Sequence, residues 1–468
     1  MIRLLILLTG LAMAACLRPP SPPPTDAPAT ATGPFASRPV ARIEAVPDDW
    51  WRLYDDARLD DFVEATLAAN ADLRVAFANL EAARAATSQA QAMRWPQLGL
   101  ESGATIGGAS KRPSSALVPS TKWDIAATAS WDLDLFGRLW AGALAARADA
   151  EAQEAALDAV KVAVVADTAQ AYVDLCGATR GLSEAREIFE SQQRMARLVE
   201  KQLAAGEVSP LELSQAATLA ASSRAAIMPF EAQRANALYR LATLQGRPPA
   251  ESLDFEIECV AAPRLRGAAP VGDGTALLLR RPDVREAERR LAAAAARIGV
   301  ARADLYPRVN LGGALGLLAG RYDVVMTPLV TWMLFNQAPA RARLEQSRAI
   351  ERAALANWDV VVLRALREVE SALAAYDAEL RRNGALATAT TEAEAYARRA
   401  AARVRLGDAP SLLQVDARRA LASARLQTVQ SDLAVGQAEV ALFRALGGGW
   451  RRGETEMSET DPDQQDGS

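Results

Sequence analysis

The chain has 468 residues, a formal net charge of −4 and no histidine. So small a net charge at this length indicates no nucleic-acid partner, and the lack of histidine removes the commonest general base and metal ligand. Half of the residues are hydrophobic but only 5% are aromatic, which is typical of long, closely packed helices when alanine supplies much of the apolar share. Neither a Gly-x-Ser-x-Gly nor a phosphate-loop pattern is present, so we expect no enzyme, cofactor or metal site.

The first fifteen residues have the pattern of a bacterial lipoprotein signal. Their apolar stretch, Leu4 to Leu11, is far shorter than the ~20 residues of a membrane-spanning helix. Small residues then precede Cys16, although Met13 stands where such signals usually have leucine. We predict a signal peptide at 1–15 and lipidation of Cys16; the alternative is an ordinary signal peptide with an incidental cysteine. Leu17 stands where aspartate would favour inner-membrane retention, so we expect the outer membrane.

Both ends of the mature chain have the composition of unfolded segments. Residues 16–46 are rich in proline, alanine and threonine and predict a lipid-anchored tether with no prospect of a core. Residues 451–468 are acidic and polar and predict a disordered tail. The remaining cysteines, Cys176 and Cys259, leave two alternatives open: small core residues, or a disulfide in an oxidising periplasm.

A β-hairpin is predicted after Trp95-Pro96. Apolar residues alternate with polar ones from Leu98 to Ile106 and again from Trp123 to Leu135, and the segment between is rich in Gly, Ser and Pro. A second hairpin is predicted from Val309 to Leu317 and near Val324 to Phe335, where the alternation is poorer. Such a sheet either packs on a soluble core or faces lipid with its apolar side. Four strands cannot close a barrel, so a membrane sheet would require several chains, and three chains give twelve strands.

Very long helices are predicted behind both hairpins. No proline interrupts Gly137 to Ala205 or Ala340 to Leu406, and each stretch would be about 100 Å long as one helix. Gly177 and Gly181 are candidate kinks in the first stretch. Charged residues occur on the other faces throughout, so we expect solvated rods that cross the periplasm. A coiled-coil spacer is the alternative, but it would not explain the hairpins.

The chain is an internal duplication. Residues 72–103 align with 283–314 at an offset of 211, pairing Pro96 with Pro307. Further along the offset is 201, pairing Gly206 with Gly407, so the second half is about ten residues shorter between the two blocks. Each half predicts a helix, a hairpin, a very long helix and a further helix. The expected domains are a first repeat at 47–247, a linker at 248–272 and a second repeat at 273–450.

Three motifs, in this order within a duplicated chain, resemble the bacterial outer-membrane factor family of TolC-like efflux channels, and most closely its OprM-like lipoprotein branch. They are Asp132-Leu133-Asp134-Leu135-Phe136-Gly137-Arg138-Leu139, Leu278-Leu279-Arg280-Arg281-Pro282-Asp283 and Ala445-Leu446-Gly447-Gly448-Gly449-Trp450. The resemblance implies a mainly α fold with a β-barrel part: a homotrimer with one twelve-stranded outer-membrane barrel, one α-helical periplasmic barrel and a mixed equatorial region. It also implies a periplasmic adaptor and an inner-membrane pump of the resistance-nodulation-division (RND) type as partners.

The resemblance further implies a gate at the periplasmic ends of the helices. Leu412 and Asp416 match the residues whose side chains narrow the channel, and the turns at Gly206 and Gly407 would contact the adaptor. The alternative for Asp416 is a cap or an ion pair with Arg419 or Arg403.

The segment Trp332 to Gln337 departs from the family pattern, which usually has a proline before the phenylalanine and a glycine-rich turn. The expected function is a passive export conduit, with the cargo undetermined. The competing hypothesis is a lipoprotein that bridges the envelope layers as a structural or adaptor protein without a pore.

Overall fold

The computed structural model describes residues 35–36, 41–42, 44, 46–106, 121–254, 259, 262–318 and 321–449. The predicted signal peptide, Cys16 and the tail at 451–468 therefore lie outside the described residues. The chain divides into two compact units. The first unit contains the described residues within 77–156 and 283–361, and the second contains the others.

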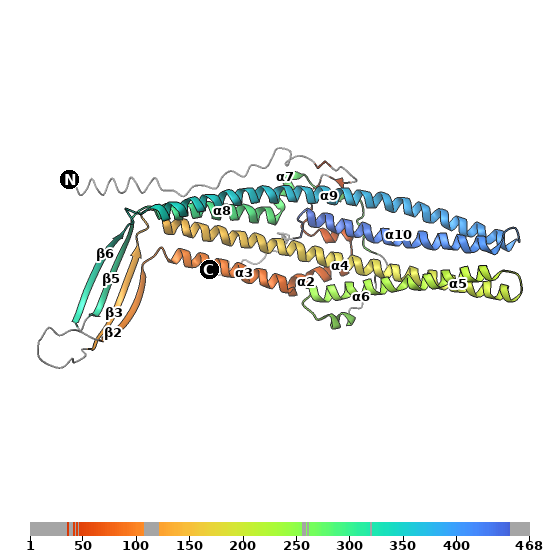
Figure 1. Ribbon diagram of the computed structural model, residues 1–468, viewed down its shortest axis with the longest axis horizontal. Coiled ribbons are helices and arrows are strands. Elements are labelled where there is room, and N and C mark those ends of the chain that lie inside the picture. Colours follow the sequence, from red (N-terminus) through yellow and green to blue (C-terminus); the bar gives the residue numbers. More distant parts are fainter. Residues whose placement is uncertain are drawn as a thin grey trace, which may run out of the picture. The chain divides into compact units, whose positions relative to one another are not determined.

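The first unit contains a four-stranded antiparallel sheet (Figure 1). Its strands are β2 (Gln97–Ile106), β3 (Thr121–Asp132), β5 (Arg308–Leu318) and β6 (Arg321–Thr331), in the order β2-β3-β5-β6. Both predicted hairpins are therefore present, and the pairing of β3 with β5 joins them.

The fourth strand differs from the prediction at both ends. It was expected near Val324 to Phe335, but β6 begins at Arg321 and ends at Thr331. Pro328, which weakened the predicted alternation, lies opposite Leu311 in a strand at the edge of the sheet. Edge strands tolerate proline because the missing N–H need not serve a second neighbour.

The sheet exposes large apolar side chains. Leu98, Leu100 and Met326 are 83%, 77% and 82% exposed. A soluble sheet would bury one such face against a core. The described part of the chain supplies no cover for these side chains, which favours the alternative in which they meet lipid or another chain.

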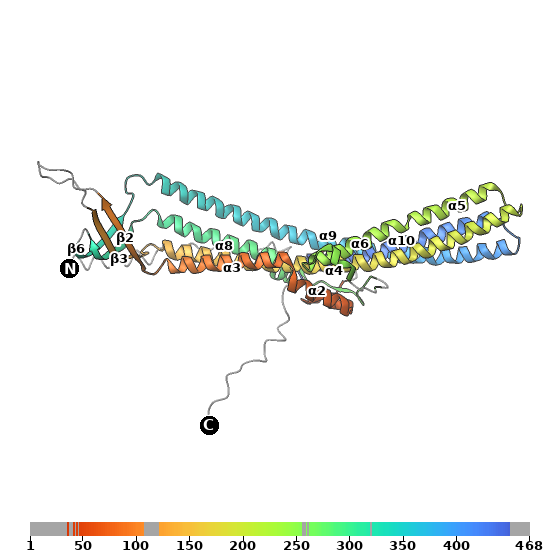
Figure 2. The ribbon, with the colours of Figure 1, turned by 90° about the horizontal axis from the view of Figure 1, so that it is seen from below.

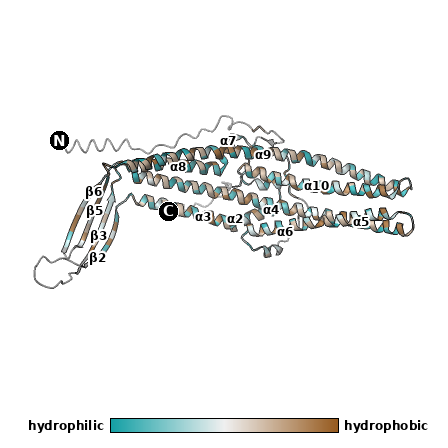
Figure 3. Ribbon diagram, viewed as in Figure 1, coloured by the Kyte–Doolittle hydropathy of each residue, from teal (hydrophilic) through white to brown (hydrophobic). Residues whose placement is uncertain are grey.

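Helices occupy the rest of the first unit and continue into the second. α3 (Ala71–Ala92) and α8 (Pro282–Ala303) precede the hairpins, whereas α4 (Arg138–Ala204) and α9 (Ala338–Arg405) follow them. The two long helices have 67 and 68 residues, or about 100 Å each. Hydrophilic and hydrophobic residues alternate along them (Figure 3). Among the described residues, no helix combines the length and apolarity needed to cross a bilayer.

Close packing explains the two glycines that were expected to kink α4. The helix runs through both positions. A Cβ atom at Gly177 would lie 2.6 Å from Leu433 Cδ1, and one at Gly181 would collide with the ring of Phe230. Glycine here gives other helices a close approach to α4.

The main core lies in the second unit. It joins η2 (Trp50–Tyr54) and α2 (Ala57–Ala69) to α4, α9 and α10 (Ser411–Ala445). The remaining elements are α5 (Pro210–Ala225), α6 (Ile227–Leu244), η3 (Pro249–Asp254) and α7 (Gly274–Arg280). Figure 2 shows α5 and α10 running lengthwise beside the ends of α4 and α9.

Part of the predicted tether belongs to this core. Phe35 and Val46 are 7% and 8% exposed within the core cluster. β1 (Ala41–Arg42) pairs in parallel with β4 (Ala269–Pro270). The expectation that 16–46 packs against nothing is wrong for these residues, because an isolated phenylalanine and valine gain by burial what the surrounding composition does not offer.

Candidate functional site

The two long helices end in the same kind of turn. Gly206 and Gly407 follow α4 and α9 with φ angles of 73° and 74°, in the left-handed region that favours glycine. Glu207 N donates to Gln202 O at 2.9 Å, and Asp408 N donates to Arg403 O at 3.0 Å. These bonds satisfy carbonyl groups left open at each helix end. The turns expected from the duplication thus have matching backbone geometry.

A carboxylate joins the two turns. Glu212 Oε2 accepts a hydrogen bond from Ser209 N at 2.8 Å at the start of α5. Its other oxygen accepts from Ser411 Oγ at 2.6 Å at the start of α10. The bonds from Ser411 and then Ser209 lower the pKa of Glu212, so the link is made by the ionised form. The Ser209-x-x-Glu212 pattern is a visible capping box, but the bond to Ser411 spans 199 residues and was missed.

The predicted gate residues line one cavity between α5 and α10. Its volume is about 710 Å³. Leu412 and Asp416 contribute from α10, with Ser214 and Thr218 opposite them on α5. Leu412 is 40% exposed in the single chain. The structure therefore brings Leu412 and Asp416 together.

Asp416 has a partner within its own helix. Its Oδ1 accepts from Arg419 Nη2 at 2.6 Å, and both side chains remain about half exposed or more. Arg403 instead pairs with Asp408, at 3.0 Å, in the turn after α9. Of the two ion pairs considered for Asp416, the one with Arg419 is formed.

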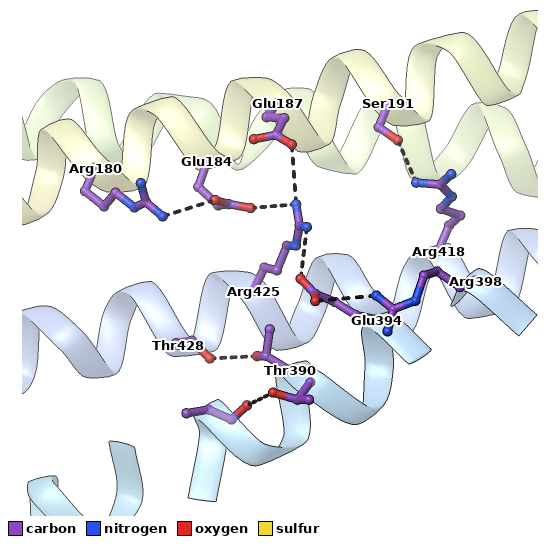
Figure 4. Close-up of polar contacts among 12 residues, drawn as sticks. Arg180, Glu184, Glu187, Ser191, Thr390, Glu394, Arg398, Arg418, Arg425 and Thr428 are labelled. Carbon is purple, nitrogen blue, oxygen red and sulfur yellow. Dashed lines mark hydrogen bonds and ion pairs between the residues drawn. The ribbon is translucent and has the colours of Figure 1, made fainter. Parts of the chain in front are cut away.

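An arginine on α10 ties the two helical hairpins together (Figure 4). Arg425 contacts Glu184 at 3.3 Å and Glu187 at 3.4 Å on α4, and Glu394 at 3.1 Å on α9. Burial would lower the pKa of Arg425, but the hydrogen bond to Glu394 and the nearby carboxylates raise it overall. The cation is thus held between helices by three anions. Sequence analysis paired Arg425 with Arg224 in the duplication but gave no sign of these partners.

The first of the three motifs forms the junction between β3 and α4. Asp132 Oδ2 accepts from Arg138 Nη2 at 2.8 Å. The carboxylate of Asp134 accepts from Leu139 N and Trp140 N, each at 2.8 Å, and so caps the first turn of α4. The alternating aspartates therefore change the chain from strand to helix.

Comparison with known proteins decides the family. The model of the outer membrane efflux protein family matches residues 62–247 and 275–448. The chain belongs to this family. It is 32% identical to outer membrane protein OprJ of Pseudomonas aeruginosa over 96% of both chains. It is 29% identical to the cation efflux system protein CusC of Escherichia coli O157:H7, covering 86% of this chain and 88% of CusC. The solved structure of the outer-membrane channel OprN matches with a TM-score of 0.85 and 34% identity, over 92% of this chain and 99% of OprN.

This efflux family member is an outer-membrane channel subunit with the TolC-like fold. Its relatives are outer-membrane components of efflux pumps, which work with an adaptor and an inner-membrane pump. The family is one of transport proteins rather than known enzymes.

The other two motifs of the efflux channel meet in the second unit. Arg280 Nη2 binds Asp48 at 2.7 Å, near the start of the first repeat. Arg281 donates to Ala445 O, at the end of α10, and to Glu368 Oε2, both at 2.9 Å. The paired arginines therefore fasten the two ends of the duplicated chain to each other, a role that the motif alone does not reveal.

The cysteines form a disulfide. Cys176 and Cys259 have Cα atoms 5.1 Å apart, and the bond joins the linker to α4. Both residues lie in the main core. The second alternative left open by the sequence is therefore the one realised.

A buried carboxyl group lies near this core. Glu439 on α10 is 2% exposed, and its Oε1 accepts a hydrogen bond from Tyr376 at 3.3 Å. Burial raises the pKa of Glu439 to about 7, against the lowering effects of Leu265 N, Tyr376, Arg264 and Tyr54. Its position amid the regular pattern of α10 gave no signal in the sequence.

Proposed function

We propose that three copies of this efflux channel subunit pool their strands into one twelve-stranded barrel and their helices into one periplasmic tube. The observation that carries the proposal is the open sheet, whose edges β2 and β6 are unpaired among the described residues of one chain and whose apolar side chains are exposed. Lipid offers no hydrogen bonds to an unpaired strand edge. A closed ring of three sheets satisfies every edge, which makes the trimer obligate.

The proposed conduit passes small molecules from an RND-type inner-membrane pump and its adaptor to the outside. The turns at Gly206 and Gly407 would contact the adaptor, and their shared geometry and the Glu212–Ser411 bond support a single composite surface. Lipidation of Cys16 would add a membrane anchor to the barrel. We retain the division into repeats at 47–247 and 273–450 with the linker at 248–272.

Leu412 and Asp416 are proposed to form rings in the trimer that narrow the channel. Threefold symmetry repeats each residue around the axis. Leucine rings close pores by dewetting, and carboxylate rings select cations. Arg419 would hold the Asp416 carboxylate in place until the channel opens.

The test is single-channel conductance in planar bilayers, together with the native mass of the detergent-solubilised protein. Leu412→Ala with Asp416→Ala should raise conductance and reduce cation selectivity. The matched control is Leu211→Ala, because Leu211 is the counterpart of Leu412 at the offset of 201 and is 64% exposed. Unchanged conductance in the double variant would move the gate elsewhere. A protein with no conductance in any variant would instead favour the structural lipoprotein that has no pore.

A further inference from the structure

Two tryptophans occupy the same place in the two repeats. The ladder of the first hairpin ends with Gln97 opposite Ser130, and that of the second ends with Arg308 opposite Thr331. The next pair outward is Pro96 with Trp131 in one hairpin and Pro307 with Trp332 in the other. Each tryptophan is therefore placed across from the proline that begins its hairpin.

Both indole groups make the same hydrogen bond. Trp131 Nε1 donates to Arg94 O, and Trp332 Nε1 donates to Leu305 O, each at 3.1 Å. Each acceptor lies two residues before the proline. The acceptors are separated by the offset of 211 and the donors by the offset of 201, so this contact is part of the duplication.

The chemistry of the junction explains why a donor is needed there. Helix ends leave carbonyl groups without helical partners, and proline cannot donate to a strand ladder. In water such a carbonyl would be hydrated, but at the edge of a bilayer an unpaired carbonyl is costly. An indole suits this place because it joins one N–H donor to a large apolar ring. Trp131 and Trp332 are 38% and 46% exposed, so much of each ring remains free although its N–H is bonded.

We propose that Trp131 and Trp332 are positioning residues that hold the two hairpins at the phospholipid interface on the periplasmic side. Each ring lies among the lipid headgroups, and its N–H closes the carbonyl at the point where the chain passes from helix to strand. The inference rests on the proposed membrane channel, because only a lipid boundary makes this hydrogen bond more valuable than hydration.

The sharpest perturbation removes the N–H and keeps the ring. Benzothienylalanine, in which sulfur replaces the indole nitrogen, would be placed at position 131, at position 332 and at both, in protein held in phospholipid nanodiscs. The matched control is the same replacement at Trp95, which is next to the first junction and 72% exposed. Hydrogen–deuterium exchange would be followed in peptides that cover residues 97–100 and 308–311.

Each single replacement should speed exchange about fivefold in its own hairpin only, the change that loss of one hydrogen bond gives. The double replacement should affect both hairpins, and the Trp95 control neither. Unchanged exchange in both hairpins, or an equal change in the control, would overturn the proposal.

Lipid contact is tested separately with brominated phospholipids. The fluorescence that Trp131→Phe and Trp332→Phe together remove should be quenched most by bromines near the headgroup. Stronger quenching by bromines deep in the acyl chains, or by aqueous iodide alone, would refute the interfacial position. Conductance of the unmodified protein tests the channel itself, so failure of the pore and failure of the indole contact are distinguishable.

Discussion

Replacement of Glu439 by glutamine should make the channel more stable, and only above neutral pH. The carboxyl group is 2% exposed, and burial raises its pKa from an ordinary 4.5 to about 7. A difference of this size corresponds to about 3 kcal/mol. Between these two values the folded protein keeps the proton that the unfolded chain has lost. Stability from this group is therefore fully present below pH 4.5 and is lost as the pH rises to about 7.

Glutamine keeps the shape of the side chain and cannot ionise. Glu439→Gln should match the original protein near pH 4.5 and exceed it at pH 8 by up to about 3 kcal/mol. The assay is the apparent melting temperature of the detergent-solubilised protein across pH 5 to 8.5. Glu190→Gln is the control, since the Glu190 side chain is 66% exposed and should give no pH-dependent difference.

The hydroxyl of Tyr376 provides a second check on the same group. It donates to Glu439 and thereby favours the ionised form. Tyr376→Phe should move the midpoint of the pH dependence upward. A Glu439→Gln protein whose melting temperature differs by the same amount at every pH, or is lower at pH 8, would refute the reasoning.

Three further changes test the packing of the second unit by the same melting assay. Cys259→Ser opens a loop of 83 residues and should cost about 4 to 5 kcal/mol, and reduction of the original protein should lower its stability equally; no effect of reduction would mean that the bond is not closed in solution. Arg425→Ala should cost about 1 to 3 kcal/mol because it leaves Glu184 buried beside fewer cations, and adding Glu184→Gln should recover part of the loss. Gly407→Ala should cost about 1 kcal/mol, since alanine resists a φ of 74°, and equal stability would show that the turn relaxes.

The sequence by itself determined the elements and their repetition. Alternation of period two predicted the strands, the lack of proline predicted helices of 67 and 68 residues, and glycine at Gly206 and Gly407 predicted the turns. These features depend on neighbouring residues, so they are visible in a short window of sequence. The extent of β6 was mispredicted because the end of a strand depends on its partner.

Only the tertiary structure decided which distant groups meet. Ser411 binds Glu212 across 199 residues, and Cys176 joins Cys259 across 83. Phe35 enters the core from a segment whose composition predicts none. Helical and strand periodicity states which face a side chain occupies but not which other element lies against that face. Contacts between elements, and the pKa of a buried group such as Glu439, therefore follow from packing and not from the local pattern.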